Sequence, residues 1–329
     1  MSGDRQTAWA GMTPLGALDT SQIDDASPIV CSVLVGRVST RDGERIFELL
    51  SAMRRQRPAV RHEIIVADRL NNEVSARIAA DFPEVMLIPC ASETTLPALR
   101  AAALASARGV YAIVTEDHCV PADDWLAEIV AGFRRATADV AAVGGSVANG
   151  LRDRWIDRAT FQCEYGKYVP PVDDSLSDDL PGMNIGYSLE HLRTVDSALL
   201  HAGFWESDVH TALLQRGFVF QSSNRIRVTH KKHFGFTEFI RQRFWYSRHF
   251  AGNRFPENSP ARRAVAFALT PALPLILLWR FHTAAVRRPA YIVEFGSSLP
   301  LLTVFALVWA IGEMAGYVFG PGDALRKLE

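Results

Sequence analysis

Apolar runs and amphipathic stretches alternate along residues 29–143, and this alternation limits the fold more than any other feature of the sequence. The apolar runs are as long as single strands and rich in β-branched residues, which is typical of strands covered on both faces. The runs are Ile29–Val35, His62–Ala67, Val85–Ile88, Tyr111–Val114 and Val140–Val143. Helix-like stretches separate them, at Arg45–Arg55, Asn71–Phe82, Leu96–Ala107 and after Asp124. This order predicts an α/β fold, a mostly parallel, doubly wound sheet with helices on both faces.

Two carboxylates and an imidazole follow the fourth predicted strand directly. Glu116, Asp117 and His118 stand there, where burial makes such groups costly without a partner or a function. Ligands bind at the carboxyl ends of strands in open α/β sheets, and carboxylate oxygen with imidazole nitrogen is a plausible ligand set for a divalent metal. The alternative is a polar loop in which Asp123 and Asp124 cap the next helix. The residues alone leave both interpretations open.

Composition narrows the class of protein. The chain has 329 residues, enough for one large core or two modest ones, and a net charge of −1. A nucleic-acid binder should show a basic excess, so we expect no nucleic-acid partner. The four cysteines form no CxxC pair and are predicted to be reduced thiols of a cytosolic domain: Cys31, Cys90, Cys119 and Cys163. Met1–Ser27 is polar, has no apolar signal sequence and is predicted to be a disordered tail.

The second half is less regular. Its segments predict a polar irregular stretch, a loop feeding a short strand, an amphipathic helix, two strands and an aromatic, arginine-rich helix. These are Arg152–Asp179, Pro181–Ser188, Gly203–Gly217, Phe218–Phe220, Ile226–Val228 and Phe236–Phe250. A compact basic cluster, His230 to His233, precedes the last helix.

Two uncharged apolar segments end the chain. Ala264–Trp279 and Phe295–Gly312 are each near the ~20 residues that a membrane span needs. The alternative, a pair of buried core helices, is less favoured because neither segment has a polar face to meet water. Pro271 and Pro274 should kink the first segment. Basic residues in the connection argue against a simple hairpin with its turn exported, and favour a re-entrant or in-plane first segment. They are Arg280, His282, Arg287 and Arg288.

Taken together, residues from about Ile29 to Phe250 resemble family 2 glycosyltransferases, which have a GT-A type, Rossmann-like nucleotide-sugar-binding fold. Four places carry the resemblance. They are SVLVGR with HEIIVAD, the block LPALRAAALASARGVYAIVTEDHCVPADDW, the segment PGMNIGYSLEHL, and WESDVHTALLQRG. There is no GxGxxG or Walker-type glycine loop, so a dinucleotide or P-loop site is not supported.

On the donor side, the resemblance implies a nucleotide-sugar site with a divalent metal. The family's two DxD aspartates fall on Glu116 and His118, and His230 could complete the coordination of Mn²⁺ or Mg²⁺. The imidazole suits Mn²⁺ better than Mg²⁺, which prefers oxygen. Asp117 could replace a ligand or hold the ribose. The resemblance places Asp68 near the base, and Arg100 could pair with the diphosphate or with Asp68. Lys231 could bind phosphate.

On the acceptor side, the family's catalytic aspartate falls on Glu206, with Asp208 as the competing base. Asn184 could bind a sugar hydroxyl or merely close its turn, and Trp205 would lie beside the acceptor. The Gln-x-x-Arg-Trp motif of processive synthases is not intact, since Phe244 stands where the arginine would be. That difference favours a single transfer over polymer synthesis.

The resulting hypothesis is a membrane-associated glycosyltransferase that uses a UDP- or GDP-sugar, inverts the anomeric centre and has a membrane- or lipid-linked acceptor. Its predicted parts are a tail (1–27), a cytoplasmic catalytic domain (28–255, with a donor half 28–150 and an acceptor half 151–255) and a membrane-associated segment (256–329). The degraded motifs keep open an alternative, a non-catalytic membrane-anchored protein that binds nucleotide sugars. A nucleotidyltransferase is less favoured because its glycine-rich, lysine-containing loop is missing.

Overall fold

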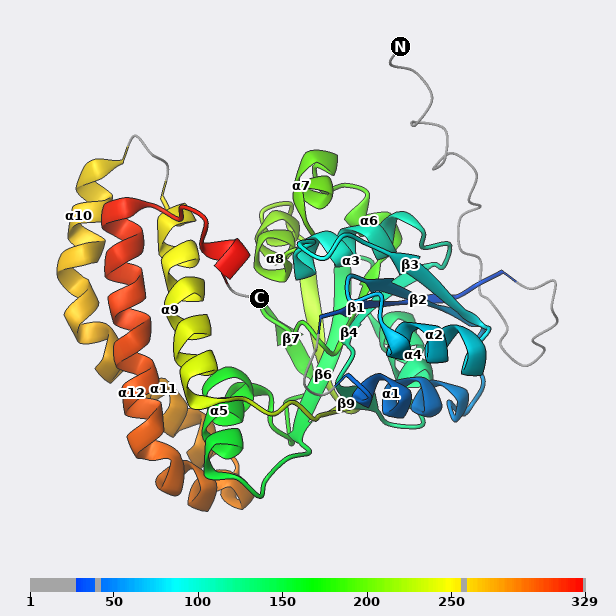
Figure 1. The fold of residues 1–329 in the computed structure, drawn as a ribbon, viewed down its shortest axis with the longest axis horizontal. Coiled ribbons are helices and arrows are strands. Elements are labelled where there is room, and N and C mark those ends of the chain that lie inside the picture. The colour runs from blue at the N-terminus through cyan, green and yellow to red at the C-terminus, as the bar shows by residue number, and fades with distance from the viewer. Residues whose placement is uncertain (1–27, 39–42, 256–258, 328–329) are drawn as a thin grey trace, which may run out of the picture.

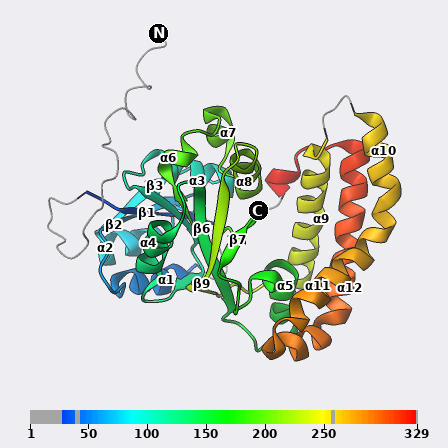
Figure 2. The same cartoon turned by 180° about the vertical axis from the view of Figure 1, so that it is seen from behind.

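The computed structural model describes residues 28–38, 43–255 and 259–327, so the predicted tail 1–27 lies outside the described residues. The described chain forms a sheet-based body and a helical arm beside it (Figures 1 and 2). The body contains the predicted α/β domain, and the arm contains the last helix of that domain together with both apolar segments.

One mixed sheet of nine strands runs through the body, in the order β3-β2-β1-β4-β8-β6-β9-β5, with β7 paired to β9. Strand β1 pairs in parallel with β2 and β4, β2 with β3, and β6 with β9, whereas β8, β5 and β7 pair antiparallel to their neighbours. The strands are β1 (Cys31–Arg37), β2 (His62–Asp68), β3 (Val85–Pro89), β4 (Tyr111–Glu116), β5 (Cys119–Pro121), β6 (Val140–Asn149), β7 (Ser175–Ser177), β8 (Ile185–Ser188) and β9 (Val219–His230). The predicted mostly parallel sheet is confirmed.

Helices cover both faces of this sheet, as the alternation predicts. One core cluster joins the sheet to α1 (Arg45–Arg54), α2 (Glu73–Asp81), α4 (Trp125–Arg135) and α5 (Trp155–Tyr165). A second cluster joins the other face to α3 (Leu96–Ala105), α6 (Leu189–Leu192), α7 (Ser197–Ala202) and α8 (Glu206–Leu214). The two separate clusters are what a sheet with two apolar faces requires.

Strand β9 is one element where the sequence predicts two short strands. Polar residues between the two apolar runs hide its continuity, and a register shift at Gly145 and Ser146 of β6 accommodates them. A Cβ atom on Gly145 would lie 2.1 Å from the Ile226 carbonyl oxygen, so only glycine allows this close approach. Because β9 is continuous, its carboxyl end at His230 reaches the same edge of the sheet as the end of β4.

The arm consists of α9 (Phe236–Asn253), α10 (Pro260–Leu269), a 3-10 turn η3 (Thr270–Ala272), α11 (Leu273–Val286) and α12 (Pro289–Phe319), followed by η4 (Ala324–Lys327). The turn η3 falls at the predicted proline kink. Two segments of the arm, Pro260–Val286 and Tyr291–Phe319, are long and apolar enough to cross a membrane. Only 6% of the most apolar window of the first segment is buried, so that segment is not a core helix.

The predicted capping of α4 differs from the structure. Asp123 and Asp124 do not cap α4 with their side chains. They pair instead with arginines of neighbouring elements, Asp123 with Arg55 at 3.3 Å and Asp124 with Arg227 at 3.1 Å. Long-range partners supplied by the fold replaced a local hydrogen bond. The cysteines are free thiols, as predicted.

Candidate active site

The carboxyl ends of β4 and β9 meet at one edge of the sheet. Glu116 is the last residue of β4, and a two-residue turn carries the chain into β5. Strand β5 pairs antiparallel with β9, with Cys119 opposite His230. The backbone N–H of Lys231 also donates to the carbonyl of His118 at 2.9 Å. These ladder contacts place the imidazoles of His118 and His230 side by side.

Three side-chain atoms converge at this point. The Nε2 atom of His118 lies 3.0 Å from a carboxylate oxygen of Glu116 and 3.1 Å from the Nε2 atom of His230. These ligand atoms all lie within 4.8 Å of one another, and both imidazoles are buried. Tyr165 packs against the His230 ring with centroids 4.8 Å apart. We call Glu116, His118 and His230 the Glu-His-His cluster.

Burial and charge act in opposite directions on the cluster. Burial alone would raise the pKa of Glu116, but His118 and the nearby Arg100 guanidinium hold it well below its usual range. Burial favours neutral His118, yet its hydrogen bonds to Asp117 and Glu116 raise its pKa above the ordinary value. The pKa of His230 lies well below its ordinary value, because of burial and the nearby charge of His118. The pKa values of the two imidazoles are therefore shifted in opposite directions.

Asp117 orients one imidazole of the cluster. Its Oδ1 atom lies 2.8 Å from Nδ1 of His118, and its Oδ2 atom accepts a hydrogen bond from the backbone N–H of Val38 at 3.1 Å. A carboxylate on Nδ1 leaves Nε2 directed at the cluster, which is the arrangement that commonly supports metal-binding histidines. Asp117 is thus beside the cluster, in a supporting position, and is not one of its three converging groups.

Arg100 connects the cluster to Glu206. This arginine of α3 is 2% exposed, and its guanidinium pairs with Glu116 at 3.2 Å and with the carboxylate of Glu206. Burial lowers the pKa of the Arg100 guanidinium, but the two carboxylates outweigh it and raise the pKa. The predicted alternative pairing of Arg100 with Asp68 is therefore wrong, since both ion pairs of Arg100 go to the other two acids.

Glu206 and Asp208 occupy different environments although both lie in the first turn of α8. Glu206 is partly buried, and its carboxylate lies over Gly182, where a Cβ atom would come within 2.2 Å of Oε1. Asp208 is exposed, and its pKa is raised by partial burial and by the charge of Glu206. Only Glu206 is tied through Arg100 to the cluster.

A narrow cavity of about 80 Å³ opens beside the cluster. Lys232 lines it, whereas Lys231 points away and pairs with Glu48 of α1 at 2.5 Å. The basic residue at the cavity is therefore the neighbour of the predicted one. His233 hydrogen-bonds Asp157 through Nδ1 at 2.8 Å and does not line the cavity. The lining residues are Gly36, Val38, Leu96, Glu116, Asp117, His118, Glu164, Tyr165, Lys232, Phe234 and Gln242.

Asp68 and Asn184 are buried away from this cavity. Asp68 is fully buried, and its carboxylate accepts hydrogen bonds from Arg37 at 2.8 Å and from Ser75 at 2.5 Å. Asn184 accepts from the Trp125 indole at 2.7 Å and donates to two backbone carbonyls. A base or a sugar could reach these groups only by breaking those bonds. Both side chains therefore make structural contacts in this conformation, and Asn184 links α4, β6 and β9.

Trp205 lies on the side of the site that faces the arm. Its ring packs on Tyr246 with centroids 5.4 Å apart and on His249 at 5.9 Å, both on α9. Because Glu206 follows it directly, a molecule bound along this ring would lie next to that carboxylate. This position suits the predicted acceptor side.

Sequence reasoning missed several cavity residues. Glu164 and Tyr165 come from α5, in a stretch that the sequence predicts to be irregular, and burial raises the pKa of Glu164. Gln242 follows Arg241 in the altered family motif on α9. The aromatic and charged spacing of residues 155–165 is helical, and that pattern could have indicated α5.

The cluster fits a divalent metal on the evidence of its own geometry. Two facing Nε2 atoms at 3.1 Å leave room for at most one proton between them, and a carboxylate oxygen completes the set. Two imidazole nitrogens disfavour Mg²⁺, which prefers oxygen ligands, and suit Mn²⁺ and the later divalent transition metals better. Glu116, His118 and His230 would hold the ion, with Asp117 behind His118.

Comparisons with known proteins agree with this architecture. A family model described as "Glycosyl transferase family 2" matches residues 40–195. A similar solved structure is the mannosyltransferase PcManGT from Pyrobaculum calidifontis in complex with GDP-Man and Mn²⁺, with 19% identity and a TM-score of 0.53. The alignment covers 89% of this chain and 91% of that chain. No curated protein matches the sequence. The predicted GT-A-like fold and family resemblance are confirmed.

Proposed function

We propose that the chain is an enzyme that moves a sugar from a nucleotide diphosphate donor to a hydroxyl acceptor, in keeping with the match of residues 40–195 to the glycosyl transferase family 2 model. The donor half is residues 28–150, the acceptor half 151–255, and the membrane-associated part 256–329. A UDP- or GDP-sugar is the proposed donor, and the similar mannosyltransferase was solved with GDP-Man.

One observation carries the proposal. The Glu-His-His cluster, which can hold a cation, is joined through the buried Arg100 to Glu206, which can accept a proton. Glycosyl transfer needs both functions within the length of one sugar, because the leaving diphosphate and the attacking hydroxyl lie on opposite sides of the anomeric carbon. The arginine fixes the spacing between the two functions.

The donor end is the cluster with its cavity. A bound divalent cation would neutralise the developing charge of the diphosphate leaving group. Glu116, His118 and His230 would hold it, and Asp117 keeps His118 in the productive orientation. Lys232 lines the cavity and can pair with a phosphate oxygen, so it replaces Lys231 in the proposed donor site. We retain Arg100 as an organising residue of this site.

The acceptor end is Glu206. Its carboxylate accepts the proton of the attacking hydroxyl as the bond to the anomeric carbon forms and the bond to the diphosphate breaks. Displacement in a single step inverts the anomeric configuration. The ion pair with Arg100 holds the carboxylate of Glu206 in one place, and the missing side chain of Gly182 leaves room for it there. Asp208 is the weaker candidate because it is exposed and has no link to the cluster.

The acceptor is proposed to be membrane- or lipid-linked. Trp205, next to Glu206, packs on the rings of Tyr246 and His249 of α9, the helix of the arm that lies beside the site. The arm carries two segments of membrane-like length and hydropathy. An acceptor held at a membrane would therefore approach Glu206 from the arm side. We place the body on the cytoplasmic side, in keeping with its free cysteines.

The test is release of nucleoside diphosphate from a panel of UDP- and GDP-sugars by the full chain reconstituted with a membrane lipid extract and Mn²⁺. We expect release with at least one donor, loss of release with a chelator, and a fall of roughly 10²- to 10⁴-fold in Glu206→Gln with donor binding retained. Asp208→Asn, a neutralisation on the same helical turn, is the matched control and should retain activity.

The outcomes separate the parts of the proposal. Loss of turnover in Asp208→Asn with normal Glu206→Gln would reassign the base and leave glycosyl transfer standing. Metal-dependent donor binding without turnover for any donor would instead support the non-catalytic alternative.

A further inference from the structure

Helix α5 of the body and helix α9, which packs on Trp205 of the body, cover one side of α12 along the length of the helix. Near its start, Arg152 pairs with Glu294, and the Trp155 indole donates to the Ser297 carbonyl at 2.7 Å. In the middle, the rings of Phe239 and Phe305 pack with centroids 4.6 Å apart. Near its end, Arg254 donates to the hydroxyl of Tyr317 at 3.0 Å and Arg248 to the Gly320 carbonyl at 3.1 Å. These contacts come from α5, from α9 and from the adjoining residues Arg152 and Arg254.

Small residues bring α9 and α12 into backbone contact. A Cβ atom on Gly312 would lie 2.5 Å from the Phe244 carbonyl oxygen, and one on Gly316 would lie 2.5 Å from the Arg248 carbonyl oxygen. Glycines four residues apart allow helix backbones to touch. The helix α9 is thus fixed along α12, and it carries arginines at positions 241, 243 and 248.

The connection between α11 and α12 also touches the body. Arg288 donates to the Lys167 carbonyl at 2.8 Å, in the 3-10 turn η2 (Gly166–Tyr168) that follows α5. A hairpin that crossed a bilayer would carry this connection to the far side, away from the body. Both ends of α12 therefore lie on the same side as the catalytic machinery.

A membrane-spanning α12 would also be energetically costly. The 31 residues of α12 extend for about 46 Å, more than the ~30 Å hydrocarbon core, and α9 and α5 run beside them. A crossing α12 would draw their arginines to membrane depth, where charged side chains are strongly disfavoured.

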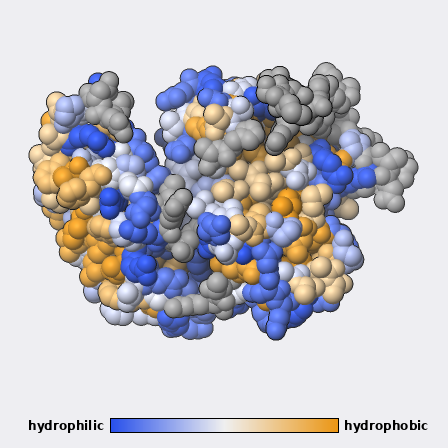
Figure 3. All heavy atoms as spheres, turned by 45° about the horizontal axis from the view of Figure 1, so that its top comes forward, coloured by the Kyte–Doolittle hydropathy of each residue, from blue (hydrophilic) through white to orange (hydrophobic). Residues whose placement is uncertain are grey.

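The opposite side of the arm is apolar and uncovered. Leu269, Leu275 and Trp279 of the α10–α11 segment are each at least 66% exposed, and Leu307, Ile311 and Val318 of α12 are at least half exposed. Figure 3 shows hydrophobic surface gathered over the arm. We call this side the lipid-facing surface.

We propose that the arm lies along the bilayer, with its lipid-facing surface inserted into a single leaflet and the body on the same side. The proposal rests on the membrane attachment assigned above and defines its form. The lipid-facing surface contacts the acyl chains of the leaflet, and the lipid headgroups contact the edge of the arm, which we call its rim.

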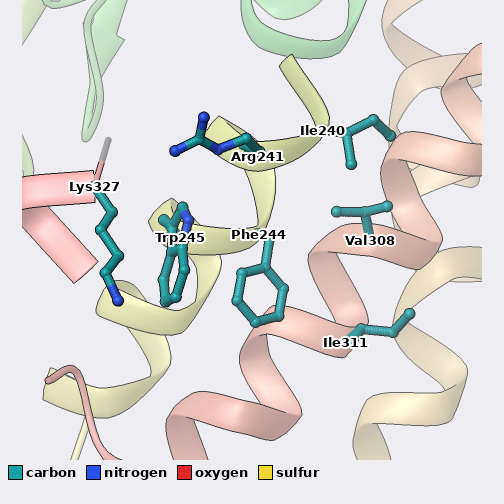
Figure 4. A pocket seen from close by; sticks show the side chains of 7 residues that line it. All are labelled: Ile240, Arg241, Phe244, Trp245, Val308, Ile311 and Lys327. Carbon is teal, nitrogen blue, oxygen red and sulfur yellow. The ribbon is translucent and has the colours of Figure 1, made fainter. Parts of the chain in front are cut away.

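A groove between α9 and α12 marks that rim (Figure 4). Its cavity of about 550 Å³ is lined by apolar side chains, with Arg241 and Lys327 beside the Trp245 indole. Arg241 is exposed and forms no ion pair with another described residue, and Lys327 lies 4.4 Å above the Trp245 ring while pairing with Asp323. Indoles and cations next to apolar surface are typical of the headgroup level. Their charge complements the phosphate groups of anionic phospholipids.

Labelling with a membrane-impermeant maleimide tests the orientation. In a Cys90→Ser background, Arg287→Cys places a thiol on the exposed connection of the arm and Glu190→Cys places one on the body. In sealed vesicles that display the body outside, we expect both thiols to react equally without detergent. Reaction of Arg287→Cys only after detergent, with Glu190→Cys reactive before it, would overturn the single-leaflet arrangement.

Flotation with vesicles tests whether the chain binds a membrane at all, and the dependence of binding on anionic lipid tests the role of the groove. Wild-type chain should float with vesicles of phosphatidylcholine and phosphatidylglycerol, and failure to float would overturn both the attachment and this inference while leaving soluble glycosyl transfer intact. Arg241→Gln with Lys327→Gln should weaken binding to these vesicles about fivefold per cation and leave binding to phosphatidylcholine unchanged. An equal loss in a control pair on the body, Arg77→Gln with Arg225→Gln, would remove the assigned role of the groove.

Discussion

Two acids stand at the carboxyl ends of strands that flank β1, and their surroundings differ: Asp68 is fully buried and Glu116 is partly buried. Asp68 ends β2 and Glu116 ends β4. The carboxylate of Asp68 is enclosed by Arg37, Ser75 and the backbone N–H of Leu70, with no exposed surface. Glu116 shares its arginine with a second acid and faces a cavity.

The difference teaches how to separate a structural acid from a functional one. In the ion pair of Asp68 and Arg37 each charge has one opposite charge, so a ligand would add no further neutralisation. At Glu116, one guanidinium serves two carboxylates, and two imidazoles face each other through the same ring atom. Such a group of polar atoms gains most from an added cation. Position at the ligand edge of the sheet is common to both acids and does not distinguish them.

The largest expected effect is on protein stability, and it concerns the buried ion pair of Asp68 and Arg37. Asp68→Ala leaves the Arg37 guanidinium buried without its counter-charge, which should lower the free energy of unfolding by about 3–5 kcal/mol. Chemical denaturation of the detergent-solubilised chain measures this. Metal affinity should remain at the wild-type value, and a loss of metal binding with unchanged stability would place Asp68 in the site after all.

A smaller change should affect activity and spare the fold. Gly182→Ala adds a methyl group whose three nearest atoms all belong to the flexible Glu206 side chain, so the carboxylate must move. We expect kcat to fall by roughly 10²-fold, with an unfolding free energy close to that of wild type. Gly166→Ala, where the added atom would touch only the Gln162 amide at 3.2 Å, is the matched control. Unchanged kcat in Gly182→Ala would mean that the position of Glu206 does not limit the reaction.

Asp117 should affect metal binding indirectly. Asp117→Asn keeps the side-chain shape but removes the charge that orients His118, and it should weaken Mn²⁺ affinity by about 10- to 100-fold. Calorimetric titration of Mn²⁺ measures the change. Complete loss of binding would indicate that Asp117 is itself a ligand, and no change would remove it from the site.

The smallest expected effect is a pH dependence at Asp179, an acid that is half exposed. Burial would raise its pKa, but His210, Lys167 and Tyr168 together lower the pKa below the ordinary value. Stabilisation by this carboxylate is therefore complete above the unfolded-state pKa of about 3.9 and is lost as the pH falls below it. The Tm difference between wild type and Asp179→Asn should shrink below about pH 4. A difference that grows in acid would reverse the sign of this linkage.

The sequence predicted the parts of the fold that depend on local pattern. Hydrophobic periodicity located the strands that place Glu116 at the ligand edge, and the spacing before Pro121 selected His118. The continuity of β9 was not predictable, because the polar residues 221–225 interrupt its apolar pattern. The pairing of β5 with β9, which makes His230 a neighbour of His118, is a contact between segments more than a hundred residues apart.

The contacts of several predicted site residues could not be foreseen, and this also has a physical cause. Lys231 and Lys232 alternate in direction in an extended segment, so the register of β9 decides which one faces the cavity. The partner of Asp68 lies on β1 and that of Arg100 on α8, and neither pairing has a sequence signal. Asn184 fits a turn or a ligand equally well until its buried neighbours are known.

Mn²⁺ binding in the presence of GDP or UDP tests the central claim most directly. Electron paramagnetic resonance of free Mn²⁺ can be followed with wild type, His230→Ala and Asp68→Asn. We predict that wild type and Asp68→Asn bind one ion per chain and that His230→Ala binds none at the same concentration. Equal binding by His230→Ala and wild type, or no binding by wild type, would contradict the assignment of the Glu-His-His cluster as the metal site.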